Sequence, residues 1–418
     1  MAKTPQQLYA EREKRYNDAV ALRKPDRVPV VGFVDFFPTR YKRMTNKQAM
    51  YDYEATAKAY LDVTLEFDWD MAPSTLPIAP GGAMELLGYK QMRWPGHDLP
   101  DDAPFQFVEG EYMKGEEYDE FLSNPELFTL RKMLPRLSTL FEPLAELPPL
   151  WLLSSGYSLS ALVPALAASP GMAKLIETLP KLAQEGMRAN IASGKLVQEA
   201  AAHGYPTVLG CMAMVTYDTI SDMFRGMRGT MTDMYRYPDK LLAMEEFFLP
   251  SAIGGAVQQT QMTHNPRCFI PLHRGAGTFM SRKQFEKFYW PQLKALLLGL
   301  IQAGIQPMPF FEGDYTERLD YLAELPPGKI AGWFDVVDVK KAKQVIGKNL
   351  CFMGNVPAQL LIAGTPQEVK DYVHMLIDTF GDTGGLIING AVSGFPAESK
   401  PANVRAVSEA VHQWGVYK

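Results

Sequence analysis

The second half of the chain alternates short apolar runs with helix-like segments, and this rhythm constrains the fold more than any other feature. Strand-like runs such as PTVLGCMAM, CFIPLHRGAG and IQPMPFFEGD are each followed by a loop and a helical segment. Strands that alternate with helices form a parallel sheet, and six or more such units favour closure into a barrel. We therefore expect an α/β protein with a (β/α)8 TIM barrel as one domain over residues 1–418.

Two segments depart from this rhythm. Residues 4–23 have a helical period, which predicts an N-terminal helical extension. Residues 76–128 are rich in proline, glycine and acidic residues, so we expect a long insertion near residues 76–128, with little regular structure, that covers one mouth of the barrel. Its aromatic content argues against disorder. Residues 129–200 read as mainly helical.

Composition excludes several classes of protein. The formal net charge is −5 and no run of lysine or arginine occurs, so no nucleic-acid partner is expected. No apolar run reaches the roughly 18 residues of a membrane span, and the N-terminal segment lacks the apolar core of a signal peptide. The three cysteines give no disulfide framework. We expect a cytoplasmic protein without membrane association.

Three candidate metal ligands recur at one spacing. His273, Glu312 and Cys351 lie in or after strand-like runs, and 39 residues separate each from the next. A β/α unit of about that length places successive strand ends side by side on one rim of a barrel. Nitrogen, oxygen and sulfur donors there suit a catalytic zinc with an open fourth position. The alternative is three unrelated strand residues, with Cys351 a core thiol, since barrel interiors also hold buried histidine and cysteine.

Several segments resemble the uroporphyrinogen decarboxylase superfamily. RVPVVGFVDFFPTRY resembles its first strand and loop, MYRYPDKL and FEKFYWPQLKALL its interior helices, and WFDVVDVKKAKQVIGKNLCFMGNVPAQLLIAGTPQEVKDYV its C-terminal core. The resemblance covers most of the chain and is weakest over residues 76–160. It implies a (β/α)8 barrel with the active site at the C-terminal ends of the strands. It also implies one of two chemistries: cofactor-free decarboxylation of tetrapyrrole acetate groups, or zinc-dependent methyl transfer to or from a corrinoid protein.

The residues for decarboxylation are mostly missing. The resemblance implies a carboxylate after the second strand, where MAPSTLP has Ser74 and Thr75, and a histidine in the last strand-loop, where NGAVSGFPAESKP has none. Arg40 matches the family's first-loop arginine and is a candidate substrate-binding residue. One guanidinium cannot neutralise eight substrate carboxylates.

The methyltransferase branch carries a His-x-Cys motif and a later cysteine, and the chain departs from both. At the position of the His-x-Cys motif the sequence is Phe310-Phe311-Glu312, and the segment NGAVSGFP, where the later cysteine would fall, has no cysteine. We expect a substituted metal set of His273, Glu312 and Cys351, with His273 and Glu312 as the better pair and as catalytic residues. Harder ligands leave more positive charge on the metal than thiolates do, which suits activation of an oxygen leaving group.

The resulting expectation is a corrinoid-dependent methyltransferase, the O-demethylase component of a larger system. It would move a methyl group from a small O-methylated donor, of which an aryl methyl ether is the favoured example, to the cobalt of a corrinoid (cobalamin) protein. This corrinoid protein is expected to be a separate partner, because no cobalamin-binding domain is visible here. Zinc is the expected cofactor. The alternatives are a uroporphyrinogen decarboxylase and a non-catalytic small-ligand-binding barrel. The sequence leaves open whether the protein forms a homodimer.

Three polar residues near predicted strand ends are further candidates for substrate binding. Tyr217 and Asp218 follow the GCMAMV strand and would orient the substrate, or would simply begin a helix with Asp218 near its N-cap. Asp335 ends the WFDVVD strand, where it would line the pocket or hydrogen-bond His273.

The remaining candidates follow other strands. Asn355 in MGNVP faces the barrel interior or forms a structural turn, and Asn389 could take the missing late ligand's place as a hydrogen-bond donor. Phe310 belongs to a set of aromatic residues near the expected mouth that would suit an aromatic substrate, although aromatic residues are also normal core material.

Overall fold

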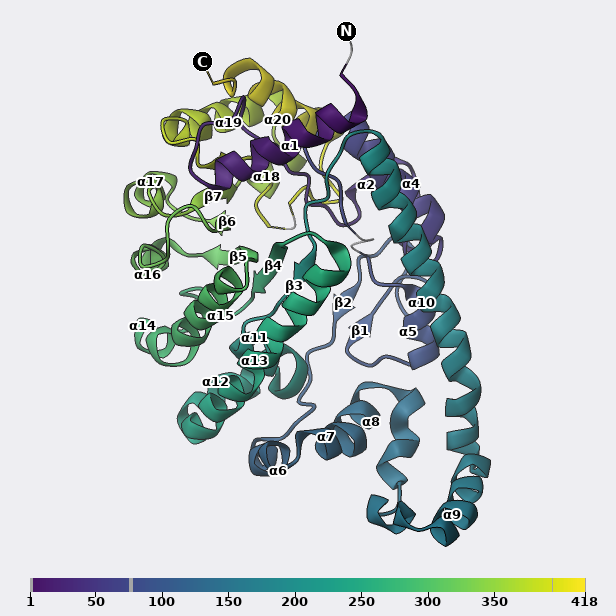
Figure 1. The fold of residues 1–418 in the computed structure, drawn as a ribbon. Coiled ribbons are helices and arrows are strands. Elements are labelled where there is room, and N and C mark those ends of the chain that lie inside the picture. Colours follow the sequence, from purple (N-terminus) through teal and green to yellow (C-terminus); the bar gives the residue numbers. More distant parts are fainter. Residues whose placement is uncertain (1–2, 75–77, 393, 418) are drawn as a thin grey trace.

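The structure is a computed structural model of the chain, and it describes residues 3–74, 78–392 and 394–417. Thr75 therefore lies outside the described residues. The core is a parallel sheet of six strands in sequential order (Figure 1). The strands are β3 (Cys211–Met212), β4 (Arg267–Leu272), β5 (Gln306–Asp314), β6 (Ala331–Val336), β7 (Cys351–Gly354) and β8 (Leu386–Ile387).

Two further segments close this sheet into a barrel. Residues 30–31 form parallel bridges to Ile388, just after β8, and to Met71. Ala72 in turn bridges in parallel to Thr207, which leads into β3. The strand positions therefore follow one another around a closed ring in chain order. The predicted (β/α)8 barrel is confirmed.

Helices follow the strands and cover the outside of the barrel. Their starts are marked in the sequence: α19 (Pro366–Phe380), for example, has Thr365 as its N-cap, and the side chains of Thr365 and Glu368 cap each other's backbone N–H groups. The main outer helices are α4 (Tyr53–Glu66), α10 (Pro170–Ala202), α13 (Pro238–Thr263), α15 (Trp290–Gln302), α17 (Val339–Ile346), α19 (Pro366–Phe380) and α20 (Pro401–Trp414). Shorter helices near the strand ends are α2 (Phe37–Tyr41), α3 (Asn46–Tyr51), α11 (Thr216–Ile220), α12 (Gly226–Arg236), α14 (Arg282–Gln284), α16 (Leu319–Leu322) and α18 (Ala358–Ile362).

The N-terminal extension forms α1 (Pro5–Val20), as predicted, and an ion cluster ties it to the barrel. Asp70 at the second strand position is fully buried. It accepts hydrogen bonds from Arg15 of α1 (2.5 Å), twice from Arg27 (2.8 Å each) and from the backbone N–H of Val30 (2.8 Å). This carboxylate therefore holds α1 and the first two strand positions together.

Alternate residues of the strands fill the barrel interior in layers. Apolar side chains occupy the lower part, around Met308, Ala331, Cys351 and Ile387. Aromatic side chains lie closer to the C-terminal ends of the strands. Because side chains alternate along a strand, the next inward position on several strands is polar, and these positions form the rim described below.

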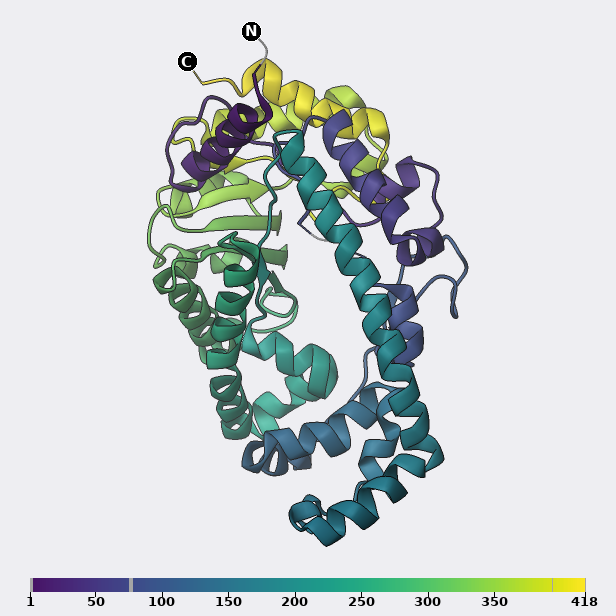
Figure 2. The same ribbon diagram turned by 45° about the vertical axis from the view of Figure 1, so that its right-hand side comes forward.

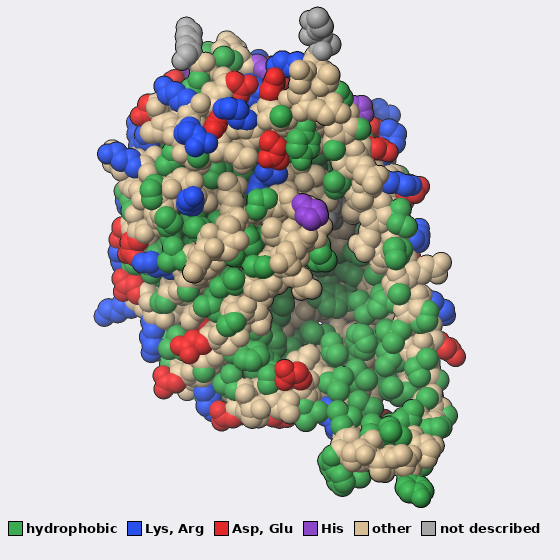
Figure 3. Space-filling view, in the orientation of Figure 1, with side chains coloured by type: hydrophobic (Ala, Val, Ile, Leu, Met, Phe, Trp, Pro, Cys, Tyr) green, Lys and Arg blue, Asp and Glu red, His purple; other side chains and the backbone are tan. Residues whose placement is uncertain are grey.

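The insertion is more regular than predicted. Its described part, from residue 78 to residue 128, includes α5 (Gly81–Leu87), β1 (Met92–Arg93), β2 (Gln106–Phe107), α6 (Tyr118–Ser123) and α7 (Pro125–Phe128). The segment that follows is helical as predicted and continues through α8 (Leu134–Leu137) and α9 (Gly156–Ala168) into α10. The expectation of little regular structure was wrong because prolines and glycines begin or end short helices here, as Pro125 does for α7. Figures 1 and 2 show these helices and α10 extending well beyond the strands, and Figure 3 shows a hollow lined by hydrophobic side chains on this side of the molecule. Among the described residues, no single helix is long and apolar enough to cross a membrane; α9 and α10 reach that length and apolarity only as a pair bent by 80°.

Candidate functional site

Four of the predicted site residues lie at one level of the barrel. Strand pairing aligns Leu272 with Phe311, Phe311 with Phe334, and Phe334 with Gly354. The residues that follow these four at the C-terminal ends of the strands are His273, Glu312, Asp335 and Asn355. The structure thus brings together on one rim four residues that are separated by up to 82 positions (273 to 355) in the sequence.

His273 is held by carboxylates on two sides. Its Nδ1 lies 2.5 Å from Oδ2 of Asp222, and its Nε2 lies 3.7 Å from Oε1 of Glu312. Its backbone N–H donates to Asp218 at 2.8 Å. Arg274 also donates to Asp222, at 3.2 Å. Asp222 therefore fixes the imidazole ring, and Nε2 faces the open rim beside Glu312.

This environment favours the charged imidazolium form of His273. Burial alone would lower its pKa, but the hydrogen bond to Asp222 and the negative charges of Asp218, Asp222 and Glu312 outweigh burial and raise the pKa of His273 to about 9. Glu312 responds in the opposite sense: burial, with the charges of Asp335 and Asp222, raises its pKa despite the attraction of His273. The rim therefore holds a protonated histidine beside a carboxyl group that ionises less readily than usual.

Asp218 supports this arrangement from below. It is fully buried at the start of α11 and accepts from the N–H groups of His273 and Arg274 and from the hydroxyl of Tyr289 (2.7 Å). Burial and the nearby charge of Asp222 raise the pKa of Asp218 to about 7. Tyr217 is also fully buried, and its ring packs against Tyr289 with centroids 5.7 Å apart. The predicted pair therefore lies at the site, beneath the rim.

Glycine shapes the strand end that carries Glu312. Gly313 has a φ of +76°, which a side chain would disfavour, and the pairing of β5 with β6 shifts between Phe311 and Asp314. The N–H of Gly313 donates to Asp335 at 3.0 Å. Asp335 therefore holds the loop that carries Glu312; it does not contact His273, whose partner is Asp222.

The two asparagines hold backbone in place. Asn355 donates to the carbonyl of Asp335 (3.2 Å) and accepts from Tyr372 (3.0 Å). Asn389 is fully buried and accepts from the N–H groups of Phe33 (3.4 Å) and Gly390 (2.9 Å). Its Nδ2 has no hydrogen-bond partner among the described residues. Asn389 thus has an unpaired donor at the strand end, and its role in substrate binding stays a prediction.

Phe310 lies inside the barrel, one inward position below Glu312. Its ring stacks on Trp333 with centroids 4.0 Å apart, and Phe33 lies 4.7 Å from Trp333. Phe269 is 5.1 Å from Phe33 and completes the layer. Phe33 and Phe269 are only half-buried, so the aromatic layer forms an accessible floor beneath the polar rim.

Arg40 lies apart from this rim. It is on α2, its side chain is 52% exposed, and it lies 3.7 Å from Glu398 in a surface ion pair. Ser74, where the resemblance implies a carboxylate, accepts from the N–H of Leu209 at 2.8 Å and also hydrogen-bonds the carbonyl of that residue. This position joins the second strand position to the third and offers no charge to a ligand.

Cys351 corrects the predicted metal set. It begins β7, four residues before Asn355, which at about 3.3 Å per residue places it roughly 13 Å below the rim. It is fully buried in the apolar interior, and burial raises the pKa of its thiol. Equal spacing along the sequence did not place the three residues at one level of the barrel. Cys351 is the first residue of β7, whereas His273 and Glu312 lie well after the starts of β4 and β5.

The remaining residues do not fit a catalytic zinc. Such sites use three protein ligands, but of the rim side chains only those of His273 and Glu312 approach each other (3.7 Å), and Asp335 accepts from the N–H of Gly313. Across residues 3–74, 78–392 and 394–417, no group of three or more His, Cys, Asp or Glu side chains is arranged to hold a metal ion. Another carboxylate at the site, Asp222, is engaged with the other nitrogen of His273.

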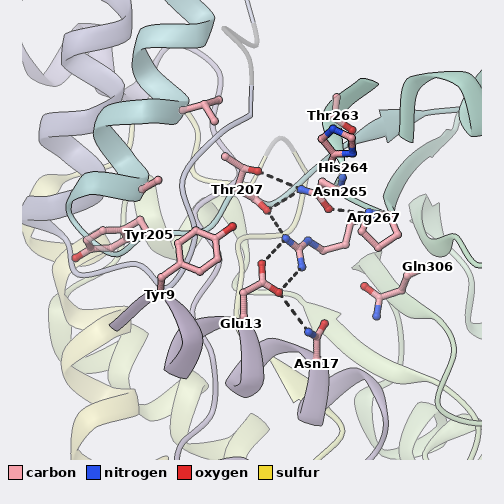
Figure 4. A pocket seen from close by; sticks show the side chains of 13 residues that line it. Tyr9, Glu13, Asn17, Tyr205, Thr207, Thr263, His264, Asn265, Arg267 and Gln306 are labelled. Atoms are coloured by element: carbon pink, nitrogen blue, oxygen red, sulfur yellow. Dashed lines mark hydrogen bonds and ion pairs between the residues drawn. The ribbon is translucent and has the colours of Figure 1, made fainter. Parts of the chain in front are cut away.

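A second pocket lies at the opposite end of the barrel (Figure 4). This cavity, of about 420 Å³, opens between α1, α10 and the N-terminal ends of β4 and β5. Arg267 crosses it and donates to both carboxylate oxygens of Glu13 (2.8 and 3.0 Å) and to the carbonyl of Thr207 (2.7 Å). Because these polar groups pair with one another, we interpret the pocket as part of the structural contact between α1 and the barrel.

The comparisons with known proteins agree with the barrel fold. The model of the family described as uroporphyrinogen decarboxylase (URO-D) matches residues 160–414, more than half of the chain. The chain belongs to the uroporphyrinogen decarboxylase family. A solved structure, a methyltransferase from Methanosarcina mazei, is similar to this family member with a TM-score of 0.64 and 14% sequence identity over 99% of each chain. No curated protein matches the sequence.

Sequence reasoning missed the residues of this uroporphyrinogen decarboxylase family member that tune His273. Asp222 is the foremost, and a signal for it existed: it lies four residues after Asp218, on the same side of a helix that follows a strand. Tyr289 and Arg274 complete the support of the two aspartates. Tyr289 carried no signal, because it reaches the site from a helix after β4.

Glu245, also missed, lies behind the rim in this family barrel. It is fully buried on α13, and neither of its carboxylate oxygens has a hydrogen-bond partner among the described residues. Burial and the charges of Asp218 and Glu246 raise its pKa well above the usual value, so the folded protein keeps it protonated.

Glu245→Gln is expected to make stability less dependent on pH. In the wild type, the unfolded chain releases the Glu245 proton above its ordinary pKa while the folded chain retains it, so stability falls as pH rises, by up to about 1.4 kcal/mol per pH unit. The glutamine variant lacks this loss. Urea unfolding should therefore show that the free energy of unfolding of Glu245→Gln rises relative to that of the wild type between pH 5 and pH 8.

Asp239→Asn is the matched control, because Asp239 is an exposed carboxylate on the same helix. It should follow the wild type at every pH. Equal pH dependence in Glu245→Gln and the wild type would show that Glu245 ionises in the folded protein.

Proposed function

We propose that this protein is a methyltransferase that moves a methyl group from a small O-methylated donor, an aryl methyl ether, to the cobalt of a separate corrinoid protein. The observation that carries the proposal is His273, which carboxyl groups keep protonated above an aromatic floor. Membership of the uroporphyrinogen decarboxylase family and the likeness in fold to a methyltransferase add support.

The aromatic floor suits the ring of the donor. Phe33 and Phe269 are half-buried, and Phe310 and Trp333 lie beside them. Stacked and edge-on aromatic pairs are worth about 0.5–1.5 kcal/mol beyond the area that they bury. An aryl ring on this floor would place an ether oxygen at the rim, near Nε2 of His273.

The reaction needs a proton for the leaving oxygen. The cobalt of the corrinoid substrate supplies the electron pair for the new bond to the methyl carbon. The carbon–oxygen bond breaks and its electron pair stays on the aryl oxygen. His273 donates the proton on Nε2 to that oxygen, and a phenol leaves. Asp222 holds the ring on Nδ1 throughout, and Glu312 lies beside Nε2 to return a proton from solvent.

The acidity of His273 matches this task. A phenol has a pKa of about 10, and burial and the surrounding carboxyl groups bring His273 to a pKa of about 9. Proton transfer is most effective when donor and acceptor are close in pKa and the donor is in the correct form at the working pH. An imidazolium thus takes the role in which a Lewis acid was expected, and no step passes through zinc.

Decarboxylation finds less support at this site. The position of the implied carboxylate is Ser74, which links two strands, and Arg40 is exposed in a surface ion pair. The two cationic side chains at the site, His273 and Arg274, are both engaged with Asp222. They are therefore not free to neutralise a substrate with several carboxylates.

The test is methyl transfer in vitro. The purified protein is mixed with cob(I)alamin and a panel of methoxyarenes, and the absorbance of cob(I)alamin is followed under anaerobic conditions. The proposal expects its loss with at least one methoxyarene and the release of the matching phenol. No transfer from any member of the panel, together with turnover of a porphyrinogen, would replace the proposal with decarboxylation.

The pH dependence gives a second check. Transfer should be independent of pH well below 9 and fall above about pH 9, where His273 loses its proton. Asp222→Asn removes the hydrogen bond and charge that raise this pKa, so the fall should move to lower pH. A fall at the same pH in both proteins would exclude His273 as its source.

A further inference from the structure

Two cysteines of the chain lie side by side on neighbouring strands. Strand pairing places Cys211 of β3 directly opposite Cys268 of β4, in parallel register. Neighbouring strands are about 4.8 Å apart, which is within the range of about 4.4–6.8 Å that separates the two Cα atoms of a disulfide. Both cysteines are free thiols. The backbone therefore holds two free thiols at the separation that a disulfide needs.

The two thiol side chains share one face of the sheet. The next residues along the strands, Met212 and Phe269, are also paired, and the ring of Phe269 belongs to the aromatic floor inside the barrel. Because side chains alternate along a strand, Cys211 and Cys268 point away from the interior, toward the helix layer. Thr260 of α13, which packs against β3 (Figure 1), agrees with this direction, since its hydroxyl donates to Sγ of Cys211 at 3.3 Å.

The two thiols differ in acidity. The thiol of Cys268 hydrogen-bonds the sulfur of Cys211, and this bond, with the one from Thr260, outweighs burial and lowers the pKa of Cys211 to about 7. The same hydrogen bond, together with burial, raises the pKa of the Cys268 thiol. A thiolate is the form of cysteine that attacks an oxidant or a disulfide. Cys211 is therefore the nucleophile of the pair, and Cys268 is the protonated thiol beside it.

Exposure gives the same order of reaction. Cys211 is 5% exposed, whereas Cys268 and Cys351 are fully buried. Cys211 is therefore the sulfur that an oxidant as small as hydrogen peroxide reaches first. Cys351 lies in the apolar interior of the barrel opposite Ala331 of β6, and burial raises the pKa of its thiol. It serves as an internal reference, a cysteine of the same chain that should not react.

We propose that Cys211 and Cys268 are a site of reversible oxidation, at which a peroxide converts the two thiols into a disulfide between β3 and β4. Sγ of Cys211, as the thiolate, attacks one oxygen of hydrogen peroxide. The O–O bond breaks, hydroxide leaves and takes up a proton, and Cys211 becomes a sulfenic acid. Sγ of Cys268 then attacks Sγ of Cys211, the S–O bond breaks, and the oxygen leaves as water with the proton of Cys268.

The electrons and atoms of this reaction balance. The two thiols lose two electrons in total, and hydrogen peroxide is reduced to two molecules of water. A dithiol reductant reverses the change by thiol–disulfide exchange. A sulfenic acid without a second thiol beside it is oxidised further to sulfinic acid, which thiols do not reduce. The place of Cys268 opposite Cys211 therefore makes the oxidation reversible. The inference rests on strand register and does not depend on the proposed function.

Thiol alkylation after oxidation tests the proposal. The folded full chain is treated with hydrogen peroxide, the excess is removed with catalase, and the chain is unfolded, alkylated with iodoacetamide and digested for mass spectrometry. We expect alkylation of Cys351 alone and a crosslinked pair of peptides that contain Cys211 and Cys268. Dithiothreitol should restore alkylation of all three cysteines. Met262, which is 68% exposed, reports the dose, because its conversion to the sulfoxide shows that the oxidant acted.

Two variants separate the steps of the reaction. Cys268→Ser removes the second thiol, so no crosslink should form, and dimedone should trap the sulfenic acid at Cys211. Cys351→Ser is the matched control, and it should form the crosslink as the wild type does. Circular dichroism checks that both variants fold, and the peptide map of the wild type decides the question if Cys268→Ser does not.

Four results would overturn the proposal. The first is alkylation of all three cysteines at a dose of peroxide that oxidises Met262. The second is a crosslink that includes Cys351. The third is sulfinic acid at Cys211 of the wild type without a crosslink, which would show that Cys268 does not reach the oxidised sulfur. The last is a crosslink that forms only after the chain is unfolded in urea, which would show that the strand register does not bring the two thiols together.

Discussion

His273→Gln is expected to lower the rate of methyl transfer by about 10²–10⁴-fold, the usual contribution of a positioned general acid. Glutamine keeps a polar side chain at the rim but has no proton to give to the leaving oxygen. The loss should be in kcat, because the aromatic floor that would hold the donor is unchanged. Stopped-flow measurement of transfer to cob(I)alamin, with the donor at several concentrations, separates kcat from KM.

His203→Gln is the matched control, since His203 is an exposed histidine at the end of α10. Its rate should equal that of the wild type. The assignment of His273 fails if His273→Gln transfers methyl groups within threefold of the wild-type rate while remaining folded. Donors with more acidic phenols should be less affected by His273→Gln, because their oxygens need less protonation.

Asp70→Asn is expected to destabilise the fold by about 3–5 kcal/mol, the cost of removing one partner from a buried ion cluster. Arg15 and Arg27 would keep their charges in a buried setting without the carboxylate that now accepts from both. The unfolding midpoint in urea should therefore fall strongly, with an unchanged dependence on urea concentration.

Asp68→Asn is the control two residues away. Asp68 is 46% exposed and pairs on the surface with His412 at 2.8 Å and Arg12 at 3.8 Å, so the change should be within about 1 kcal/mol. Equal effects of the two substitutions would show that the cluster around Asp70 does not hold α1 to the barrel.

Much of the barrel could be predicted from the sequence because its signals are local. Apolar runs marked the strands, and capping residues such as Thr4 and Thr365 marked helix starts. The insertion was misjudged because proline and glycine content does not separate irregular loops from short helices that begin with proline. The sequence does not indicate that α10 extends beyond the rim of the barrel. That extension depends on this 33-residue helix being longer than the strands.

The site could be predicted in part for the same reason. His273, Glu312, Asp335 and Asn355 were found because each lies at, or just after, the C-terminal end of a strand, and parallel strands end on one rim. Cys351 was misplaced because equal spacing along the sequence does not fix the level within a barrel; the strand register does. The spacing of Asp222 from Asp218 was a partial signal, but the hydrogen bond of Asp222 to His273 joins residues from two different strand-to-helix connections, and the sequence does not show that contact.

The most direct test of the central claim follows the methyl group itself. A methoxyarene with an isotope-labelled methyl group is incubated with the wild type and one equivalent of cob(I)alamin for a single turnover. We expect the label on cobalt, with one phenol released for each methyl group transferred and little transfer by His273→Gln. The account would be contradicted if the corrinoid stays unlabelled and the methoxyarene stays intact for every donor that binds the barrel.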